Sequence, residues 1–531
     1  MLRTLIPGFA AGIALLAVIG SALAGVLTVA GHVDLPGLMT DPYVQGVLRF
    51  TVWQAFLSAV LSVAFAVPVA RALARRPRFF GRRLLIRALG LPMVVPTIVG
   101  VLGVVAVYGR SGLVNDVLDG IGLGLRLDIY GLPGILIAHI FFNMPFATRL
   151  LLQGWAIIPG ESWRLAAQLG MTGGQIFRLI ELPMLRQVVP GVAGLIFLLC
   201  FTSFAVVLVL GGGPPNATLE VAIYQALRFD FDLGRVVAFA VLQVGLCGLL
   251  VGLGYRLARH VPVEPTLART DSRPDAGTAA GRLADGAAIL FAVLVLALPL
   301  GAVVIAGLTS GSVLNVASNP SLWQAAGRSV AIGLAAGLMS CALGWGLVDT
   351  ARNLRLRHYL PGAAHAVELC GSLVLVIPPI MLGAGLFILL RPVADVFAIG
   401  LALVVPVNAL MGLPFVLRIL MPAALQAQER HLRLADSLGM TGWNRLRLVD
   451  WPLMRRPLGL ALGLTTALSM GDFSVIALFG SAGTETLPFL LYQQIGSYRI
   501  GDAAMTAVLL VTLNLALFVT IERIVGGRSD H

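Results

Sequence analysis

Residues 165–183 read LAAQLGMTGGQIFRLIELP, and residues 434–452 read LADSLGMTGWNRLRLVDWP. The two passages share leucines, a glycine and a closing proline in one register, so that Gly170 matches Gly439. The sequence therefore predicts a tandem duplication in which each half carries one copy of this polar passage. Other parts echo one another at similar spacings: Pro145 and Pro414, Arg149 and Arg418, Phe204 and Phe473, WQAF from Trp53 and WQAA from Trp323, and VVPTIVG and VIPPIML around Pro96 and Pro378.

The rest of the chain is apolar. Hydrophobic residues make up 58% of the sequence and charged residues 12%, whereas soluble domains are about 25% charged. A membrane core about 30 Å thick requires about 20 apolar residues per helix, so the sequence predicts an all-α polytopic membrane protein with about twelve transmembrane helices. A β-barrel would need short alternating strands instead. The apolar runs lie near residues 8–30, 52–70, 88–108, 133–153, 188–210, 236–256, 286–309, 323–349, 366–390, 397–420, 457–480 and 503–523.

The net charge of +12 comes from arginine, because the chain contains no lysine. A Walker A phosphate loop and a Schiff-base enzyme both require a lysine, so the chain is neither an ATPase nor a pyridoxal enzyme by itself. It also lacks the HExxH and GxSxG motifs of hydrolases. We therefore predict no catalytic residue and no metal ligand in this chain.

The arginines gather in alternate loops, around residues 71–87, 164–186, 256–282, 352–357 and 430–456. The positive-inside rule makes these loops cytoplasmic and predicts that both termini are cytoplasmic. The first apolar run ends in SALAG, as a signal peptide can, but it exceeds the usual apolar length of about 7–15 residues. We therefore predict that it is retained as the first helix.

Each polar passage predicts a helix, a turn and a second helix. Leu165 and Leu169 lie one turn apart on one helical face, Gly170 ends the helix in a left-handed conformation, and Pro183 stops the second helix. The second copy repeats this plan with Leu434, Leu438, Gly439 and Pro452. Such a helix can rest in the lipid headgroups or fill a groove in a partner, and its recurrence in one register favours the partner.

The two passages resemble the EAA loop of type I ATP-binding cassette (ABC) importer permeases, through Ala166, Ala167, Gly170, Leu182 and Pro183, and through Ala435, Gly439 and Pro452. Leu165 and Leu434 stand where that family usually has a glutamate. The resemblance implies that each loop inserts a coupling helix into a separate cytoplasmic ATPase. The implied coupling residues are Arg164, Leu165, Ala166, Leu169, Gly170, Pro183, Arg433, Leu434, Ala435, Leu438, Gly439 and Pro452.

Two fused halves, together with stretches such as YGLPGILIAHIFFNMPFATRLLLQ and LPFLLYQQIGSYR, resemble the thiamine/thiamine pyrophosphate permeases within that family. The resemblance implies an importer in the bacterial inner membrane that works with two copies of a cytoplasmic ABC ATPase and a periplasmic thiamine-binding protein. ATP and Mg²⁺ would be held by the ATPase, and this chain would hold no cofactor. Ferric iron is the alternative substrate, and an ion-coupled secondary transporter is the alternative class.

The duplication and the resemblance together predict two parallel type I permease halves. The expected segments are a first transmembrane helix with a periplasmic loop (1–45), a first permease domain (46–256, coupling loop 161–183), a cytoplasmic linker (257–285), a seventh transmembrane helix with a periplasmic loop (286–322), a second permease domain (323–523, coupling loop 429–452) and a cytoplasmic tail (524–531).

Two further sets of polar residues are candidates for function. Asp472, an acid within an apolar run, either faces the substrate path or hydrogen-bonds a broken helix beside Gly471; Ser203 is its repeat partner. Tyr224 and Gln225 in one half match Tyr492 and Gln493 in the other. These four residues either receive the periplasmic binding protein or cap the helical bundle.

Overall fold

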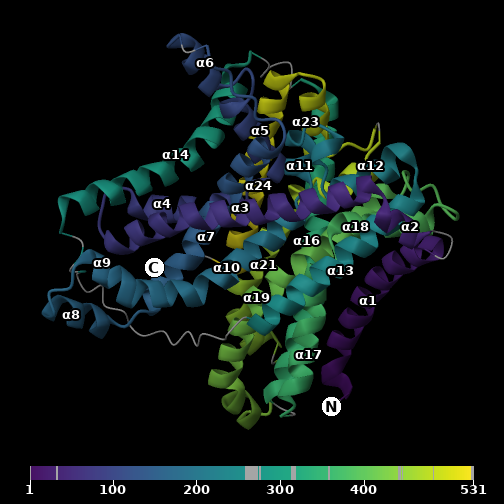
Figure 1. Ribbon diagram of the computed structural model, residues 1–531. Helices are drawn as coiled ribbons and strands as arrows, with labels where there is room; N and C mark the ends of the chain where they lie inside the picture. Colours follow the sequence, from purple (N-terminus) through teal and green to yellow (C-terminus); the bar gives the residue numbers. More distant parts are fainter. Residues whose placement is uncertain are drawn as a thin grey trace. The chain divides into compact units, whose positions relative to one another are not determined.

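The computed structural model describes residues 2–30, 34–122, 124–257, 273, 275, 277–311, 318–356, 359–440, 444, 446–481 and 483–527 (Figure 1). Within these ranges the chain is helical and contains no strand, and 11 helical stretches are long and apolar enough to cross a membrane. This confirms the all-α polytopic class. The stretches are α1 (Leu2–Ala30), α3 (Pro42–Arg75), α5 (Thr97–Tyr108) with α6 (Leu113–Gly120), α7 (Leu132–Ile157), α9 (Gly173–Ile176) through η2 (Phe177–Glu181) to α10 (Leu182–Phe201), α13 (Leu233–Leu257), α14 (Ala279–Thr309), α16 (Pro320–Leu356), α19 (Gly400–Ser437), η7 (Leu446–Asp450) through α21 (Trp451–Met470) to α22 (Ser474–Phe479), and α24 (Ile500–Gly526).

Shorter helices connect or cap these stretches. They are α2 (Leu35–Thr40), α4 (Arg82–Ala88), η1 (Leu91–Met93), α8 (Gly160–Gln168), α11 (Ala205–Leu210), η3 (Pro214–Asn216), α12 (Leu219–Gln225), η4 (Ala226–Asp230), α17 (Pro361–Ser372), η6 (Leu373–Val376), α18 (Pro379–Leu390) and α23 (Leu487–Gly496).

The apolar run at 366–390 is not the single span that the sequence predicts. It is divided into α17, η6 and α18, of which α18 is shorter than a span. Pro378 and Pro379 cause the break, because a residue before proline is disfavoured in the helical region and Pro378 itself is extended, with ψ 150°. The first half also breaks at a proline, Pro96, which has ψ 133° and directly precedes α5.

The described chain forms two compact units that do not follow chain order. Unit 1 contains residues 1–39, 222–244 and 307–531, and unit 2 contains residues 40–221 and 245–306. The first helix, α1, thus belongs with the second half, where the Gly8 amide donates to Thr350 Oγ1 at 3.0 Å. Most of α14 belongs with the first half, where the rings of Phe65 and Phe291 lie 5.1 Å apart.

A close glycine contact joins α1 to α18 within unit 1 (Figure 1). A Cβ atom added to Gly25 would clash with the carbonyl oxygen of Gly385, and one added to Gly385 would clash with that of Ala22. Small residues let two helices approach in this way, which is the usual basis of helix packing in membranes.

The two halves start their first shared helix in the same manner. The Asp41 side chain accepts from the Tyr43 amide at the start of α3, and the Asn319 side chain likewise accepts from the Ser321 amide at the start of α16. Thr51 accepts a hydrogen bond from Leu219 N at 3.0 Å, and Ser329 accepts one from Leu487 N at 2.8 Å. This register pairs Pro42 with Pro320. When the two helices are aligned in this way, WQAF and WQAA lie about two helical turns apart and are not equivalent. Local composition, rather than structural equivalence, produced that match.

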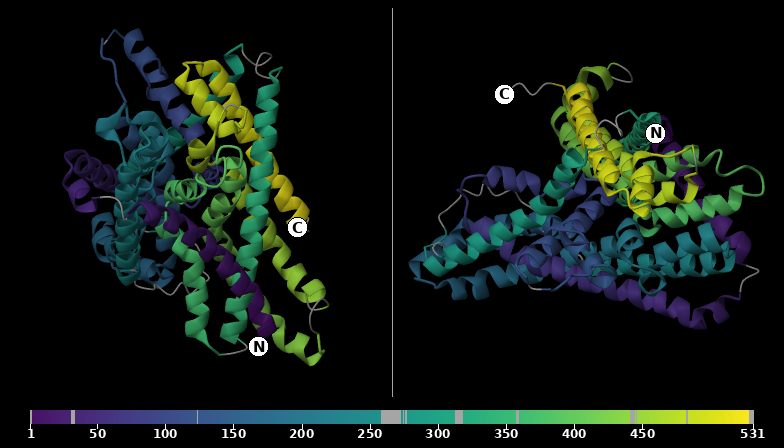
Figure 2. Two further views of the ribbon diagram at one scale, coloured as in Figure 1. Left: turned by 90° about the vertical axis from the view of Figure 1, so that its right-hand side faces the viewer. Right: turned by 90° about the horizontal axis from the view of Figure 1, so that it is seen from above.

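The polar passages lie at one end of each unit. In unit 2, α8 lies at the end opposite to α6 (Figure 1). In unit 1, the far end of α19 lies at the same end as the N-terminus (Figure 1 and Figure 2).

Candidate functional site

The first polar passage folds as a compact helix–turn–helix. The chain leaves α7 at Pro159, forms α8, turns at Gly170 with φ +60°, and enters α9 through a capping box between Thr172 and Gln175. The left-handed conformation at Gly170 is costly for any residue with a Cβ atom. The predicted helix, turn and second helix are therefore present.

The sequence predicts that Pro183 stops the second helix. In the structure it does not. The chain continues from α9 through the π-helical turn η2 into α10, and Pro183 occupies the first turn of α10. Proline has no amide to donate, and Pro183 directly follows the π-helical turn, in which the Leu182 amide donates to Phe177 O. Pro452 likewise lies in the first turn of α21.

The first loop has an inner and an outer face. Trp163, Ala166 and Ile176 are buried together and form a small apolar core. Leu165 and Leu169 are 56% and 68% exposed. Arg164 is also exposed and pairs with Glu161 at 3.1 Å. The structure therefore exposes two leucines one turn apart on one helical face, as docking to a partner would require.

The second loop follows the same plan with one difference. The helix α19 runs without a break into the second passage as far as Ser437, and Gly439 then turns the chain with φ +64°. The first half breaks at Pro159, whereas the repeat register places Gln428 at the equivalent position of the second half, which permits a continuous helix. Leu438 is 66% exposed. The side chains of Arg433, Leu434 and Ala435 lie outside the described residues.

A buried carboxylate, Glu181, holds the first loop to three other parts of unit 2. Glu181 is fully buried. It accepts hydrogen bonds from Arg71 Nε of α3 at 2.6 Å, from Trp155 Nε1 of α7 at 2.9 Å, and from Arg273 of the linker. A buried charge requires this degree of pairing, so Glu181 fixes the exit of the loop to the bundle.

The described part of the linker is attached to the same place. The guanidinium of Arg273 lies 4.2 Å from the Trp163 ring, which is a cation–π distance. Asp275 accepts from Arg75 Nε at 2.9 Å and from Arg273 at 3.1 Å. Burial raises the pKa of Asp275, but the hydrogen bond from Arg273 and the neighbouring arginine charges outweigh it, so that its pKa lies below the ordinary value. Residues 273 and 275 therefore bind to the first loop and to α3 and do not only connect the two halves.

The second loop has a smaller counterpart of this network. Asp450 occupies the position in the second passage that Glu181 occupies in the first, and it accepts from Arg352 Nη1 of α16 at 3.0 Å. Arg352 also pairs with Asp349 at 2.6 Å. Both halves therefore use an acid two residues before the closing proline to bind an arginine of a neighbouring helix.

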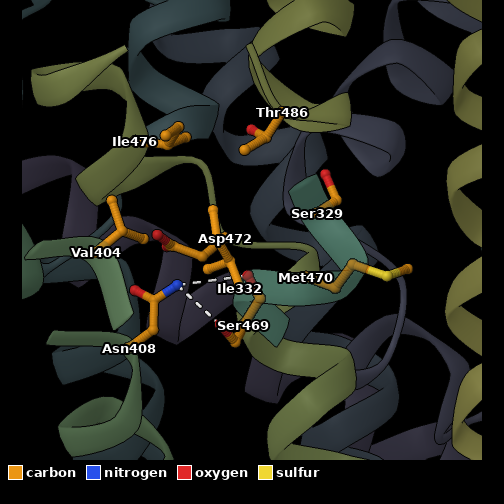
Figure 3. Close-up of a pocket in the computed structure, with 9 residues that line it drawn as sticks. All are labelled: Ser329, Ile332, Val404, Asn408, Ser469, Met470, Asp472, Ile476 and Thr486. Atoms are coloured by element: carbon orange, nitrogen blue, oxygen red, sulfur yellow. Dashed lines mark hydrogen bonds between the residues drawn. The ribbon is translucent and has the colours of Figure 1, made fainter. Parts of the chain in front are cut away.

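Asp472 lies where α21 ends and α22 begins (Figure 3). Its carboxylate accepts from the amides of Ser474 and Val475, both at 3.2 Å, and so caps the short helix α22. The cap satisfies amides that a broken helix leaves without intrahelical partners. Of the two roles considered for Asp472, the broken-helix contact is present; a role in the substrate path stays a prediction.

The pocket beside Asp472 is small, and polar side chains line more than one of its walls. Asn408 projects into it and donates to Ser469 Oγ at 3.0 Å, while Thr486 lies on the opposite wall (Figure 3). In this conformation the pocket has room for about one water molecule. Its remaining lining residues are Ser329, Ile332, Val404, Met470 and Ile476.

Ser203 occupies the equivalent helix break between α10 and α11 in unit 2. His139 Nε2 lies 2.9 Å from Ser203 Oγ, and His139 Nδ1 lies 2.7 Å from Ser58 Oγ. The register that matches Gly170 with Gly439 also matches His139 with Asn408. Each half therefore places a polar residue of its long helix, His139 or Asn408, beside its broken helix. The residue at the break is the neutral Ser203 in one half and Asp472 in the other.

Comparison with known proteins agrees with this duplicated architecture. A thiamine transport system permease protein of Brucella abortus (strain 2308) is 47% identical over 92% of this chain and 89% of its own length. The corresponding protein of Escherichia coli (strain K12) is 43% identical over 98% of this chain and 97% of its own length. The chain belongs to the thiamine transport system permease family.

Two further matches concern single halves of this permease. Residues 66–261, which include the first loop, match the family described as binding-protein-dependent transport system inner membrane component. A molybdenum transport system permease protein of Mycobacterium bovis is 29% identical over 43% of this chain and 87% of its own length. A nearly complete permease of that kind thus corresponds to less than half of the present chain, as a duplication would produce.

The four residues considered for contact with a binding protein differ in exposure in this permease. Tyr224 is buried, with its ring 5.7 Å from that of Phe229. Tyr492 is half-buried against Phe473, with ring centroids 4.9 Å apart, Gln225 is half-buried and Gln493 is exposed. A binding-protein contact at these residues stays a prediction, and Gln493 is the member of the set that is accessible in this conformation.

The sequence did not single out Glu181, Arg71, Arg273 or Asp275. The acid pair Glu181 and Asp450 was nevertheless visible, because the repeat register aligns both just before the closing proline of the loop. The arginine partners had no such signal, since arginines fill every predicted cytoplasmic loop.

Proposed function

We propose that this chain is the membrane-spanning permease of an ABC importer that carries thiamine or thiamine pyrophosphate from the periplasm to the cytoplasm. The observation that supports this most strongly is the similarity to thiamine transport system permease proteins over nearly the whole chain. The two exposed, glycine-terminated loops supply the mechanical part of the proposal.

The partners in this proposal are two copies of a cytoplasmic ABC ATPase and a periplasmic thiamine-binding protein. We propose that the chain lies in the inner membrane of a bacterium, with the arginine-rich loops and both termini in the cytoplasm. Exposed Leu165 and Leu169, and Leu438 in the second loop, supply apolar faces for the two ATPase subunits. ATP and Mg²⁺ belong to those subunits.

In this mechanism ATP binding draws the two ATPase subunits together, and each loop transmits the movement to its half of the permease. The first loop is suited to this because Glu181 and its arginines tie it to α3 and the linker while Trp155 ties it to α7. A loop fixed to several helices moves them as one body, which is what alternating access requires. Asp472 and Ser203 stay candidates for the substrate path, where a carboxylate would attract the thiazolium cation.

The test is uptake in bacteria that lack their own thiamine permease. Cells that express this chain with its ATPase and binding protein are given radiolabelled thiamine or radiolabelled ferric iron, with unlabelled thiamine pyrophosphate as competitor. We expect thiamine uptake that stops when the ATPase is omitted or inactivated. Iron uptake without thiamine uptake would overturn the substrate, and thiamine uptake that persists without the ATPase but stops with a protonophore would favour a secondary transporter.

A further inference from the structure

The connection that follows α3 carries a basic surface without acids. Residues 76–90 read RPRFFGRRLLIRALG and contain five arginines and no aspartate or glutamate. The stretch lies between the candidate span Pro42–Arg75 and the span that begins at Thr97. Its two ends are therefore held where the flanking helices leave the membrane.

Three of these arginines are exposed and have no polar partner in the described part of the chain. Arg76 pairs with Asp285 at 2.8 Å, and Arg82 donates to the carbonyl oxygen of Arg76 at 3.1 Å. By contrast, Arg78, Arg83 and Arg87 are exposed, and none has a hydrogen bond or ion pair with any residue that the structure describes. Arg83 and Arg87 lie one turn apart on α4 and so present their guanidinium groups on one face.

Apolar side chains stand exposed beside these arginines. Phe80 is fully exposed, and Leu84 of α4 is 72% exposed. Gly81 has φ +81° and turns the chain between Phe80 and α4. An exposed aromatic and aliphatic pair among arginines, at the end of a membrane span, is the composition of a segment that lies in the lipid interface.

At the corresponding place in the second half, an arginine has an acid partner within the chain. Near the end of α16, Arg355 pairs with Glu368 at 3.0 Å. The positive-inside rule accounts for arginine on this side of the membrane in both halves. It does not account for the contrast between Arg355, which pairs with Glu368, and Arg78, Arg83 and Arg87, which have no acid partner among the described residues.

We propose that Arg78, Arg83 and Arg87 bind the headgroup phosphates of anionic phospholipids, with Phe80 and Leu84 inserted at the acyl boundary. Guanidinium groups suit phosphate because they donate paired hydrogen bonds. The lipid is the occupant because both ends of the segment are fixed at the membrane surface and its apolar side chains are exposed there. This inference rests on the membrane spans and not on the transported substrate.

The experiment is native mass spectrometry of the full chain, purified in detergent and titrated with phosphatidylglycerol, cardiolipin or phosphatidylethanolamine. The test variant is Arg78→Gln/Arg83→Gln/Arg87→Gln. Each basic residue near an anionic surface contributes roughly a fivefold gain in binding, so the triple variant should bind phosphatidylglycerol about a hundredfold more weakly. The matched control removes three arginines that have aspartate partners in the structure, Arg110→Gln/Arg126→Gln/Arg235→Gln, and should retain the lipid preference.

A second variant, Phe80→Ser/Leu84→Ser, keeps every charge and should also weaken lipid binding. If the triple variant fails to fold, as judged by gel filtration and helical circular dichroism, the single variant Arg87→Gln should lose about fivefold. Equal retention of anionic lipid by the wild type and the folded arginine variant would overturn the proposal. Displacement of the lipid by millimolar inorganic phosphate would also overturn the proposal. The same holds if the arginine variant keeps its lipid but no longer co-purifies with the ATPase.

Discussion

The guanidinium of Arg273 donates a hydrogen bond to the buried carboxylate of Glu181, 92 residues away in the chain. Arg273 belongs to a polar segment whose composition suggests a simple linker, and Glu181 closes the first loop. Their contact joins the connection between the two halves to the element that we expect to receive force from the ATPase.

Replacement of Glu181 by glutamine should destabilise the protein strongly. The substitution removes the buried carboxylate that Arg71 and Arg273 share and leaves Asp275 as their remaining acid. The loss of one partner of a buried ion pair costs about 3–5 kcal/mol. Asp450→Asn should cost less, because the Asp450 side chain is 11% exposed whereas that of Glu181 is fully buried. Melting temperature in detergent measures both. The control Glu161→Gln, at an exposed pair, should change stability by less than about 1 kcal/mol. Equal melting temperatures for Glu181→Gln and Glu161→Gln would contradict the role of the network.

The attachment of the linker should depend on pH through Asp275. Because the arginines lower the pKa of this carboxyl below its ordinary value of about 3.9, its contribution to stability is complete well above that value and is lost as the pH falls toward the folded pKa. We expect wild type to be more stable than Asp275→Asn at pH 7 and the difference to shrink below about pH 4. Thermal unfolding of both proteins between pH 7 and pH 3 measures it. A difference that stays constant over this range would show that ionisation of Asp275 is not responsible.

Gly170→Val and Gly439→Val together should leave the protein in the membrane but separate ATP hydrolysis from uptake. An added Cβ atom meets no neighbour at either position, so the cost comes from the left-handed backbone and amounts to about 1–2 kcal/mol per site. That strain acts on the turn that orients each coupling helix. The matched control is Gly174→Val in the first loop, where space is also open but no positive φ is required. Thiamine uptake per ATP hydrolysed in proteoliposomes is the measurement, and wild-type coupling in the double variant would refute the role of the turns.

Two substitutions at Asp472 separate its structural role from a role in transport. The Ser474 amide donates to Oδ1 of Asp472 and the Val475 amide to Oδ2, so asparagine, with one carbonyl oxygen, can keep one of these hydrogen bonds and alanine neither. Asp472→Ala should therefore lose about 1 kcal/mol of stability and Asp472→Asn less. If the carboxylate also attracts the cationic substrate, Asp472→Asn should reduce uptake by at least tenfold although it is the more stable of the two variants. Uptake and melting temperature are measured on the same preparations. Normal uptake by the asparagine variant would restrict Asp472 to the helix cap.

The sequence alone determined the helical class, the duplication and most of the membrane spans. It also determined the two loops, because helical periodicity and the left-handed preference of glycine are local properties of residues such as Leu165, Leu169 and Gly170. Local signals failed where proline acts differently in different places. Pro378 divides an apolar run that looked like one span, whereas Pro183 sits in a first helical turn and stops nothing.

Only the tertiary structure decided which distant groups meet. The partners of Glu181 and Asp275 lie up to 200 residues away. The sequence does not distinguish these arginines from the others in the predicted cytoplasmic loops. The same is true of α1, which packs with the second half, and of the register that pairs Thr51 with Ser329. Burial makes these choices, because a charge or a hydroxyl removed from water must be satisfied by whatever the packed chain brings within reach.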